Sequence, residues 1–188
     1  EAVAAAEAIG YPVVLKGISR RVVHKSDAGL VKLRLADAGA VGAAFAAVTA
    51  ALLGAFPDEA PAAVVQEMAS GEAELIVGAR HDEGFGPQVM VGLGGILVEV
   101  LKDVRLACAP LGPQRVETLL RELALWPVLA GARGRPRADV AAIADAVSRV
   151  SWLACDLGPA LRALAITPLL ARAAGGGVIA VDGRATLE

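Results

Sequence analysis

The order of apolar and polar positions predicts short strands alternating with helices in the first third of the chain. Positions 31–35 read Val, Lys, Leu, Arg and Leu, an alternation typical of a strand with one buried face. Residues 1–9 are rich in alanine and are followed by Gly10 and Pro12, two residue types that end a helix. The elements expected here are a helix over 1–9, strands over 12–18 and 29–36, and a helix over 38–54.

The remainder of the chain contains further strand-like runs separated by Gly or Pro, and two longer helical segments. Several antiparallel-looking strands together with packed helices indicate an α+β fold. The elements expected here are strands over 62–69, 73–81, 87–95, 96–110, 161–171 and 177–186, and helices over 113–124 and 138–155.

Composition narrows the class of protein. A formal net charge of −2 argues against a general nucleic-acid binder, which usually carries a basic face. Cys108 and Cys155 have no CxxC spacing, so we expect reduced thiols in a cytoplasmic protein. No apolar run is expected to reach the roughly 18 residues that span a membrane. We therefore expect neither nucleic acid nor membrane as a partner. The chain begins within a helical segment, and for this reason we expect a fragment of a longer protein.

Charged and polar residues with candidate chemical roles lie in the first expected strand and in the loop that follows it. Lys16 lies on that strand, and His24, Lys25, Ser26 and Asp27 follow in the connecting loop. The chain has four lysines and two histidines in all, so two lysines and one histidine within ten residues stand out. A loop that handles phosphate would explain this concentration, and a solvated hairpin turn is the alternative.

Other segments complete an ordered set of motifs. They are "VVQEM" at 64–68, "GEAELIVGARHDEGFGP" at 71–87, "VGLGGILVEV" at 91–100 and "VDGR" at 181–184. In this order and spacing, together with "HKSD" at 24–27, the chain resembles the ATP-grasp domain of the NDP-forming acyl-CoA synthetases. These are the acetate–CoA ligase (ADP-forming) family, related to the β subunit of succinyl-CoA synthetase. The resemblance extends from residue 1 to about residue 186.

The resemblance implies an ATP-grasp fold in which two α/β lobes hold a nucleotide between them. The lobes are expected at 1–64, lacking part of its start, and at 65–188. The implied activity is phosphoryl transfer that supports acyl-CoA formation from an acid, CoA and ATP, with ADP and phosphate as the other products. CoA-binding ligase domains in the same or a partner chain would complete the enzyme. The alternative is a degenerate, non-catalytic nucleotide-sensing or regulatory domain fused to a GNAT protein lysine acetyltransferase.

The same resemblance implies a set of nucleotide-binding residues. Lys16 is a point charge suited to the α- and β-phosphates, although a strand lysine with an exposed head is the alternative. The backbone of 65–68 would pair with adenine, and Glu67 and Glu74 would accept hydrogen bonds from the base and a ribose hydroxyl. Each glutamate has the alternative of an ordinary exposed strand residue. The residues expected to bind nucleotide are Lys16, Val65, Gln66, Glu67, Met68, Glu74, Gly94 and Gly95.

The resemblance implies a catalytic role for His24. In the resembled family, a histidine in this loop carries phosphate between the nucleotide and the acyl-CoA chemistry. A neutral imidazole nitrogen suits that relay because it is nucleophilic near neutral pH. The family usually has paired glycines after this motif, whereas this chain has Gly29 and Leu30. Leu30 is expected to stiffen a loop that approaches phosphate closely.

The magnesium site is expected to be weakened. The family typically has an Asp-Ile-Asn-Pro element and a later aspartate, and the asparagine and that aspartate hold Mg²⁺. Here Ala165 and Thr167 stand at the two polar positions, and Asp182 is retained. Nucleotide-bound Mg²⁺ usually takes only one or two protein oxygens, so Thr167 and Asp182 are still expected to bind it. The sequence leaves open whether the protein is an active ADP-forming acid–thiol ligase.

Overall fold

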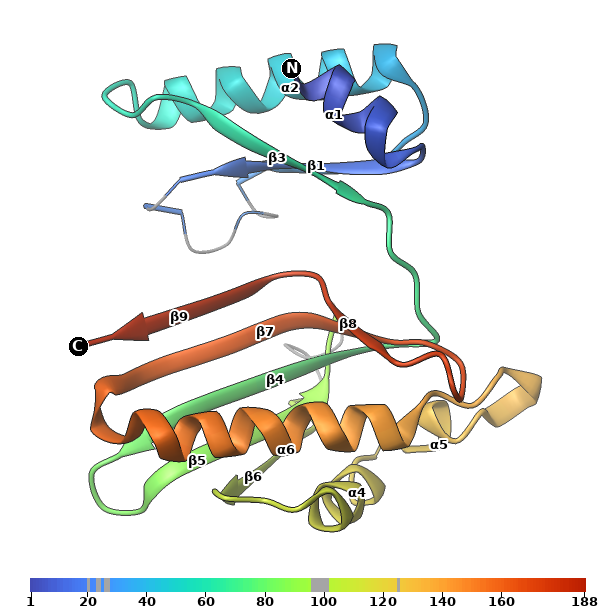
Figure 1. Ribbon diagram of the computed structural model, residues 1–188, viewed down its shortest axis with the longest axis vertical. Coiled ribbons are helices and arrows are strands. Elements are labelled where there is room, and N and C mark those ends of the chain that lie inside the picture. Colours follow the sequence, from blue (N-terminus) through green and yellow to red (C-terminus); the bar gives the residue numbers. More distant parts are fainter. Residues whose placement is uncertain (20, 23–24, 26–27, 96–101, 125) are drawn as a thin grey trace. The chain divides into compact units, whose positions relative to one another are not determined.

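The computed structural model describes residues 1–188 except 20, 23–24, 26–27, 96–101 and 125. It contains two compact units, Glu1–Met68 and Ala69–Glu188, and each is described by itself. Each unit is an antiparallel sheet with helices packed on one face (Figure 1). This is the mixed helix-and-sheet architecture that the sequence predicts.

The first unit has a three-stranded sheet in the order β2-β1-β3. Its strands are β1 (Val13–Ile18), β2 (Val31–Leu35) and β3 (Ala62–Glu67), and its helices are α1 (Ala2–Ile9) and α2 (Ala38–Ala55). Lys16 on the central strand pairs with Val31 of β2 and with Val64 of β3. Because β3 pairs with β1 along its whole length, all of β3 belongs to this unit. The lobe boundary expected at 64/65 falls inside that strand.

Helix α2 packs against the sheet through one stripe. The buried residues of this helix recur every three or four positions and are Val41, Ala44, Val48 and Leu52. At its start, the carboxylate of Asp37 accepts a hydrogen bond from the N–H of Ala40 at 2.8 Å and so caps the helix. A Cβ on Gly17 of β1 would lie 2.8 Å from Cγ1 of Val48, so glycine lets the helix approach closely.

Helix α2 also corrects one expectation. It has 18 residues and a mean hydropathy of 1.8, so by length and composition alone it is apolar enough to cross a membrane. The expectation that no run reaches this length was therefore wrong. Its stripe of buried residues belongs to the core of the first unit, and 22% of the helix is buried.

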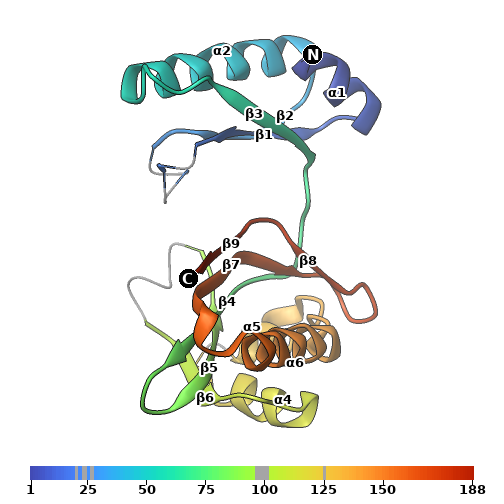
Figure 2. The ribbon, with the colours of Figure 1, turned by 60° about the vertical axis from the view of Figure 1, so that its left-hand side comes forward.

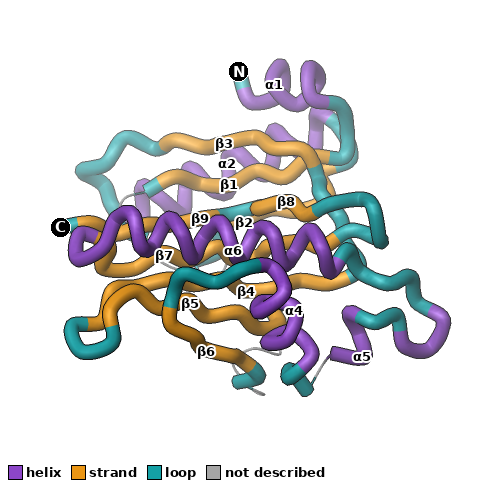
Figure 3. The backbone as a smooth tube through the Cα atoms, turned by 60° about the horizontal axis from the view of Figure 1, so that its bottom comes forward, coloured by secondary structure: helices purple, strands orange, loops and turns teal. Residues whose placement is uncertain are grey.

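The second unit has a six-stranded antiparallel sheet in the order β6-β5-β4-β7-β8, with β9 also paired to β7. Its strands are β4 (Ala73–Asp82), β5 (Gly86–Leu93), β6 (Val104–Cys108), β7 (Leu161–Ala171), β8 (Val178–Ala180) and β9 (Gly183–Leu187). Its helices are α4 (Pro113–Arg121), α5 (Trp126–Leu129) and α6 (Val140–Leu157). Figure 2 shows α4 and α6 on the same side of the sheet, and Figure 3 shows α6 running across it.

The two faces of this sheet differ because side chains alternate along each strand. On β4 the buried residues facing the helices are Ala73, Leu75, Val77 and Ala79. The residues between them face the other way and are Glu74, Ile76, Gly78 and Arg80. We call the side that carries these four residues and their cross-strand neighbours the open face. It is the side of the sheet that α4 and α6 leave uncovered.

Two buried serines attach the segment after β6 to α6. The hydroxyl of Ser148 donates to the carbonyl oxygen of Leu111 at 2.7 Å, and the N–H of Leu111 donates to Oγ of Ser151 at 2.9 Å. Both backbone groups of Leu111 are thus paired inside the core, as buried polar groups require. This pairing fixes the connection between the sheet and its helical cover.

The last expected strand, over 177–186, is two strands in the structure, so the expectation of one strand was wrong. The N–H of Thr167 donates to the carbonyl oxygen of Asp182 at 3.0 Å, and the N–H of Val181 donates to that of Pro168 at 3.1 Å. These bonds bend the chain between β8 and β9, which pair with successive parts of β7. The strand expected over 96–110 is β6 only, and residues 96–101 lie outside the described part.

Candidate nucleotide-binding site

Lys16 lies in the central strand of the first unit and is only 8% exposed. Alternation along β1 places Lys16 on the same face as Val14, opposite Val13 and Leu15, which belong to the core under the helices. A lysine with so little exposed surface is stabilised by a nearby negative charge. This position suits contact with a phosphate.

The segment 65–68 forms the end of β3 and the residue after it. Residues 65–67 pair with residues 13–15 of β1, and the N–H of Met68 donates to the carbonyl oxygen of Pro12 at 3.3 Å. Among the described strands of this sheet, β3 pairs with β1 alone and is therefore an edge strand. The backbone groups on its outer side are the kind that can bond the edge of a base.

His24, Ser26 and Asp27 lie outside the described residues, so the phosphate-carrier role of His24 stays a prediction. Leu30 follows in the same connection, just before β2. Leu30 is 2% exposed in the core of the first unit, and its carbonyl oxygen accepts a hydrogen bond from the N–H of Gly17 at 2.8 Å. Leu30 therefore anchors the loop to the core instead of facing a ligand, a role that the sequence comparison with paired glycines did not suggest.

Glu74, Gly94 and Gly95 come together at one end of β4. The N–H of Gly94 donates to the carbonyl oxygen of Glu74 at 2.7 Å. Gly95 has a φ of +75°, and a Cβ there would lie 3.2 Å from Oε2 of Glu74. Glu74 itself is exposed on the open face. The two glycines thus shape the surroundings of Glu74, and any larger residue at 95 would crowd its carboxylate.

Thr167 and Asp182 are neighbours although they are distant in the sequence. Besides the backbone bond between them, Oδ1 of Asp182 accepts from the N–H of Gly183 at 3.0 Å. In the described part of the chain, no group of three or more His, Cys, Asp and Glu side chains is arranged to hold a metal ion. We call Ala165, Thr167 and Asp182 the metal corner. It offers one carboxylate and one hydroxyl, which fits a Mg²⁺ ion held largely by nucleotide phosphates and water.

The described residues therefore form three small groups. Lys16 and segment 65–68 share the sheet of the first unit. In the second unit, Glu74 lies with the glycines at 94–95, and Thr167 lies with Asp182. The open face also carries residues that the motifs did not single out, such as Arg80; the period-two pattern of β4 was the signal that could have found them.

A comparison with protein families identifies the class of domain to which this fold belongs. The model of the ATP-grasp domain matches residues 1–187, and the chain belongs to this family. More narrowly, it is homologous to the ADP-forming acyl-CoA synthetases. It is 39% identical over 188 residues to the β subunit of acetate–CoA ligase (ADP-forming) I from Pyrococcus furiosus, covering all of this chain and 80% of that one.

Two further relatives agree with this assignment. Acetate–CoA ligase (ADP-forming) I from Archaeoglobus fulgidus is 45% identical over 152 residues, which is 80% of this chain but 22% of that protein. A solved structure of the acetyl-coenzyme A synthetase 1 of Ca. Korarchaeum cryptofilum, in complex with coenzyme A, Ca-AMPCP and HgCl+, has a TM-score of 0.91. It is 37% identical and is matched over 100% of this chain and 81% of that chain. The chain thus spans about a fifth of the single-chain ligase and most of the separate β subunit.

Proposed function

We propose that this chain binds an adenine nucleotide and serves phosphoryl transfer in an ADP-forming acyl-CoA ligase. The overall reaction would convert an acid, CoA and ATP into acyl-CoA, ADP and phosphate. The observation that carries the proposal is the little-exposed Lys16 on the strand that also pairs with edge strand β3. The relatives, which are named as ADP-forming ligases, support the reaction class.

Each group of residues has a part in binding. Lys16 attracts the α- and β-phosphates as a point charge. The backbone of 65–68 bonds the edge of the adenine base, and Glu67 accepts from its amino group. Glu74 accepts a hydrogen bond from a ribose hydroxyl, with Gly94 and Gly95 leaving room beside its carboxylate. These contacts position the nucleotide, and positioning together with charge stabilisation provides most of the catalysis of phosphoryl transfer.

A divalent cation belongs to this proposal as a weakly held partner. The Asp182 carboxylate and the Thr167 hydroxyl would hold Mg²⁺. When bound, the ion neutralises charge on the phosphates. A threonine hydroxyl is a poorer ligand than the amide oxygen that the resembled family has at this position. The chain's own residues therefore hold the ion less firmly, and nucleotide binding depends mainly on Lys16 and the backbone of β3.

His24 is proposed to accept a phosphoryl group from the nucleotide. A bond forms between an imidazole nitrogen and the γ-phosphorus while the bond to the bridging oxygen breaks, and ADP leaves. We expect protein incubated with γ-labelled ATP to gain a label that is stable to base and labile to acid. His24→Asn should remove that label, with His81→Asn as the matched control, since the chain has two histidines. An unchanged label in His24→Asn would assign His24 to a turn.

The CoA chemistry is proposed to reside in ligase domains of the same or a partner chain. A second function, nucleotide sensing without turnover, is favoured by one observation: Ala165 and Thr167 replace two polar residues of the metal corner. The relatives reported above are ligases and give the acetyltransferase-fused version of this alternative no support.

Calorimetric titration of the chain with ATP, ADP and AMP tests nucleotide binding. We expect saturable heats with ATP and ADP and weaker binding of AMP, which lacks the β-phosphate that Lys16 attracts. No heat and no thermal shift with millimolar nucleotide would contradict the proposal. An assay of acyl-CoA formation by the complete protein then separates a ligase from a nucleotide sensor.

A further inference from the structure

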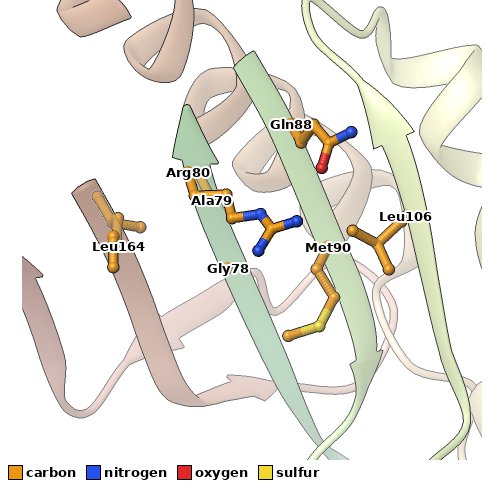
Figure 4. Close-up of a pocket in the computed structure, with 8 residues that line it drawn as sticks. Gly78, Ala79, Arg80, Gln88, Met90, Leu106 and Leu164 are labelled. Atoms are coloured by element: carbon orange, nitrogen blue, oxygen red, sulfur yellow. The ribbon is translucent and has the colours of Figure 1, made fainter. Parts of the chain in front are cut away.

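The open face of the second unit is hollowed over β4 and β5. The cavity has a volume of about 350 Å³. Figure 4 shows the hollow with the strands that form its floor. The residues that line it come from β4, β5, β6 and β7 and are Gly78, Ala79, Arg80, Gln88, Met90, Leu106, Ala163 and Leu164. All of them lie within one sheet, so the hollow is a feature of this unit alone.

The hollow exists because large and small side chains meet in one row across the sheet. Leu106 is opposite Met90, Met90 is opposite Gly78, and Gly78 is opposite Ala165. The long side chains of Leu106 and Met90 project from the sheet. Gly78 and Ala165 have little or no side chain, so the surface beside the first two is lower there. A Cβ on Gly78 would lie 3.3 Å from Cε of Met90, so even one added carbon would begin to fill the space.

Polar groups stand at one side of this apolar floor. Arg80 and Gln88 are direct cross-strand partners. Figure 4 shows the guanidinium of Arg80 reaching from β4 towards Met90, with the amide of Gln88 beside it. The Arg80 side chain is 59% exposed, and its contact with Asp82 is a long one of 3.4 Å. Arg80 is the charged residue among those that line the hollow, and it is positive.

We propose that this hollow binds a small organic carboxylate. The Arg80 guanidinium and the Gln88 amide would hold the carboxylate, because a guanidinium presents two parallel N–H groups that match its two oxygens. The hydrocarbon part would lie on Met90 and Leu106, which are opposite each other on this face. A mostly apolar cavity with a few convergent polar groups is the usual form of a small-molecule site. The proposal uses none of the residues assigned to the nucleotide.

The two methionines of the chain provide a direct test, since Met90 lines the hollow and Met68 follows β3 in the other unit. The protein is labelled with [methyl-13C]methionine, the two methyl signals are assigned with Met90→Leu, and acetate, butyrate or hexanoate is added. We expect the Met90 signal to shift in a saturable way while the Met68 signal stays in place. Affinity should rise from acetate to hexanoate, and hexanol should bind roughly tenfold more weakly than hexanoate.

Arg80→Gln should weaken hexanoate binding roughly tenfold and leave hexanol unchanged, because it removes the charge and the paired N–H groups. Arg80→Lys keeps the charge but lacks the two parallel N–H groups, so its affinity for hexanoate should lie between those of Arg80→Gln and the parent. The matched control is Arg149→Gln, since Arg149 is also paired with a nearby aspartate, Asp145, and lies on α6. An unmoved Met90 signal with millimolar hexanoate, or equal affinities in Arg80→Gln and the parent, would overturn the proposal.

A nucleotide titration in the same sample keeps the two proposals separate. If ATP shifts the Met68 signal and leaves bound hexanoate in place, the hollow is a site of its own. If ATP displaces hexanoate, the hollow belongs to the nucleotide site and the proposal is wrong. If ATP moves neither signal while hexanoate still moves Met90, the proposed nucleotide function fails and the carboxylate site stands. In the complete protein, a raised KM for the acid in Arg80→Gln identifies the carboxylate as a substrate, and loss of an added acid's effect on rate identifies an effector.

Discussion

The backbone N–H of Thr167 donates a hydrogen bond to the carbonyl oxygen of Asp182 at 3.0 Å. This bond joins the middle of β7 to the residue just before β9, and so brings together the two residues expected to hold Mg²⁺. The backbone therefore holds these two residues side by side, and one of the two expected ligands is a hydroxyl. A defect in metal binding would come from ligand chemistry and not from a misplaced strand.

Thr167→Asn should make nucleotide binding depend on magnesium. An amide oxygen is a better Mg²⁺ ligand than a hydroxyl. Even the loss of a residue that only hydrogen-bonds to a metal ligand typically costs about 10–100-fold in metal affinity or activity. We expect the parent to bind ATP about equally with Mg²⁺ and with EDTA, and Thr167→Asn to bind it roughly tenfold more tightly with Mg²⁺. Titration calorimetry in both conditions measures the difference.

Thr186→Asn is the matched control, because Thr186 is an exposed threonine on β9 outside the corner. The double change with Ala165→Asp adds a carboxylate at the other replaced position, opposite Arg184 of β9. It should increase the magnesium dependence further. Strong magnesium dependence in the parent would show that Thr167 is already a competent ligand.

Lys16→Met should weaken ATP and ADP binding by roughly tenfold or more, since it removes the ammonium group proposed to bind phosphate and keeps the length of the side chain. AMP binding should change less. Lys32→Met is the control on the same sheet, because Lys32 lies on β2 opposite Leu15. Equal losses in the two variants would indicate a general charge effect in place of a phosphate contact.

Gly95→Ala should reduce the preference for a complete ribose. The added Cβ would lie 3.2 Å from Oε2 of Glu74 and would move that carboxylate. We expect the ratio of affinities for ATP and for deoxy-ATP analogues to fall severalfold towards one, because a hydrogen bond to a charged group is worth about 1.5–3 kcal/mol. Competition calorimetry with the 2′- and 3′-deoxy analogues measures this ratio.

The control for this change is Gly86→Ala. Gly86 also has a positive φ, +72°, but a Cβ there would meet nothing within 4 Å. It imposes a similar backbone strain without the contact to Glu74. If both variants lower the ratio equally, strain is the cause and Gly95 does not position the carboxylate.

The sequence predicted the elements more reliably than the contacts between them. The expected helices at 38–54 and 138–155 correspond to α2 and α6, because the formation of a helix depends mainly on local sequence. The structure adds the caps Asp37 and Asp139, which the prediction did not use. The division of the last segment into β8 and β9 could not be predicted, since it depends on pairing with β7. The contact of Gly95 with Glu74 likewise follows from the register of β4 with β5.

Asp139 provides a test of how the second unit is held together. Its carboxylate caps α6 by accepting from the N–H of Ala142 at 3.1 Å. It also accepts from the N–H of Gly175 at 3.0 Å and of Gly177 at 2.9 Å, in the turn between β7 and β8. The bond from Gly177, followed by that from Ala142, lowers the pKa of this carboxyl below its ordinary value of 3.8. One side chain therefore joins a helix to the sheet through three backbone donors.

The consequence for stability has a definite sign. A lowered pKa in the folded state means that the charged form contributes stability that is fully present above the ordinary pKa and is lost as the pH falls through the folded pKa. We expect Asp139→Ala to lower the free energy of unfolding by about 1–2 kcal/mol at neutral pH. The difference from the parent should shrink below pH 3.8, where the carboxyl of the unfolded chain takes up its proton.

Urea unfolding followed by tryptophan fluorescence measures this difference in the second unit, which contains both tryptophans, Trp126 and Trp152. Asp145→Ala on the same helix removes only an exposed pair with Arg149 and should cost less than about 0.5 kcal/mol. A difference between Asp139→Ala and the parent that is the same at neutral and acid pH would mean that the negative charge of Asp139 adds nothing to these bonds.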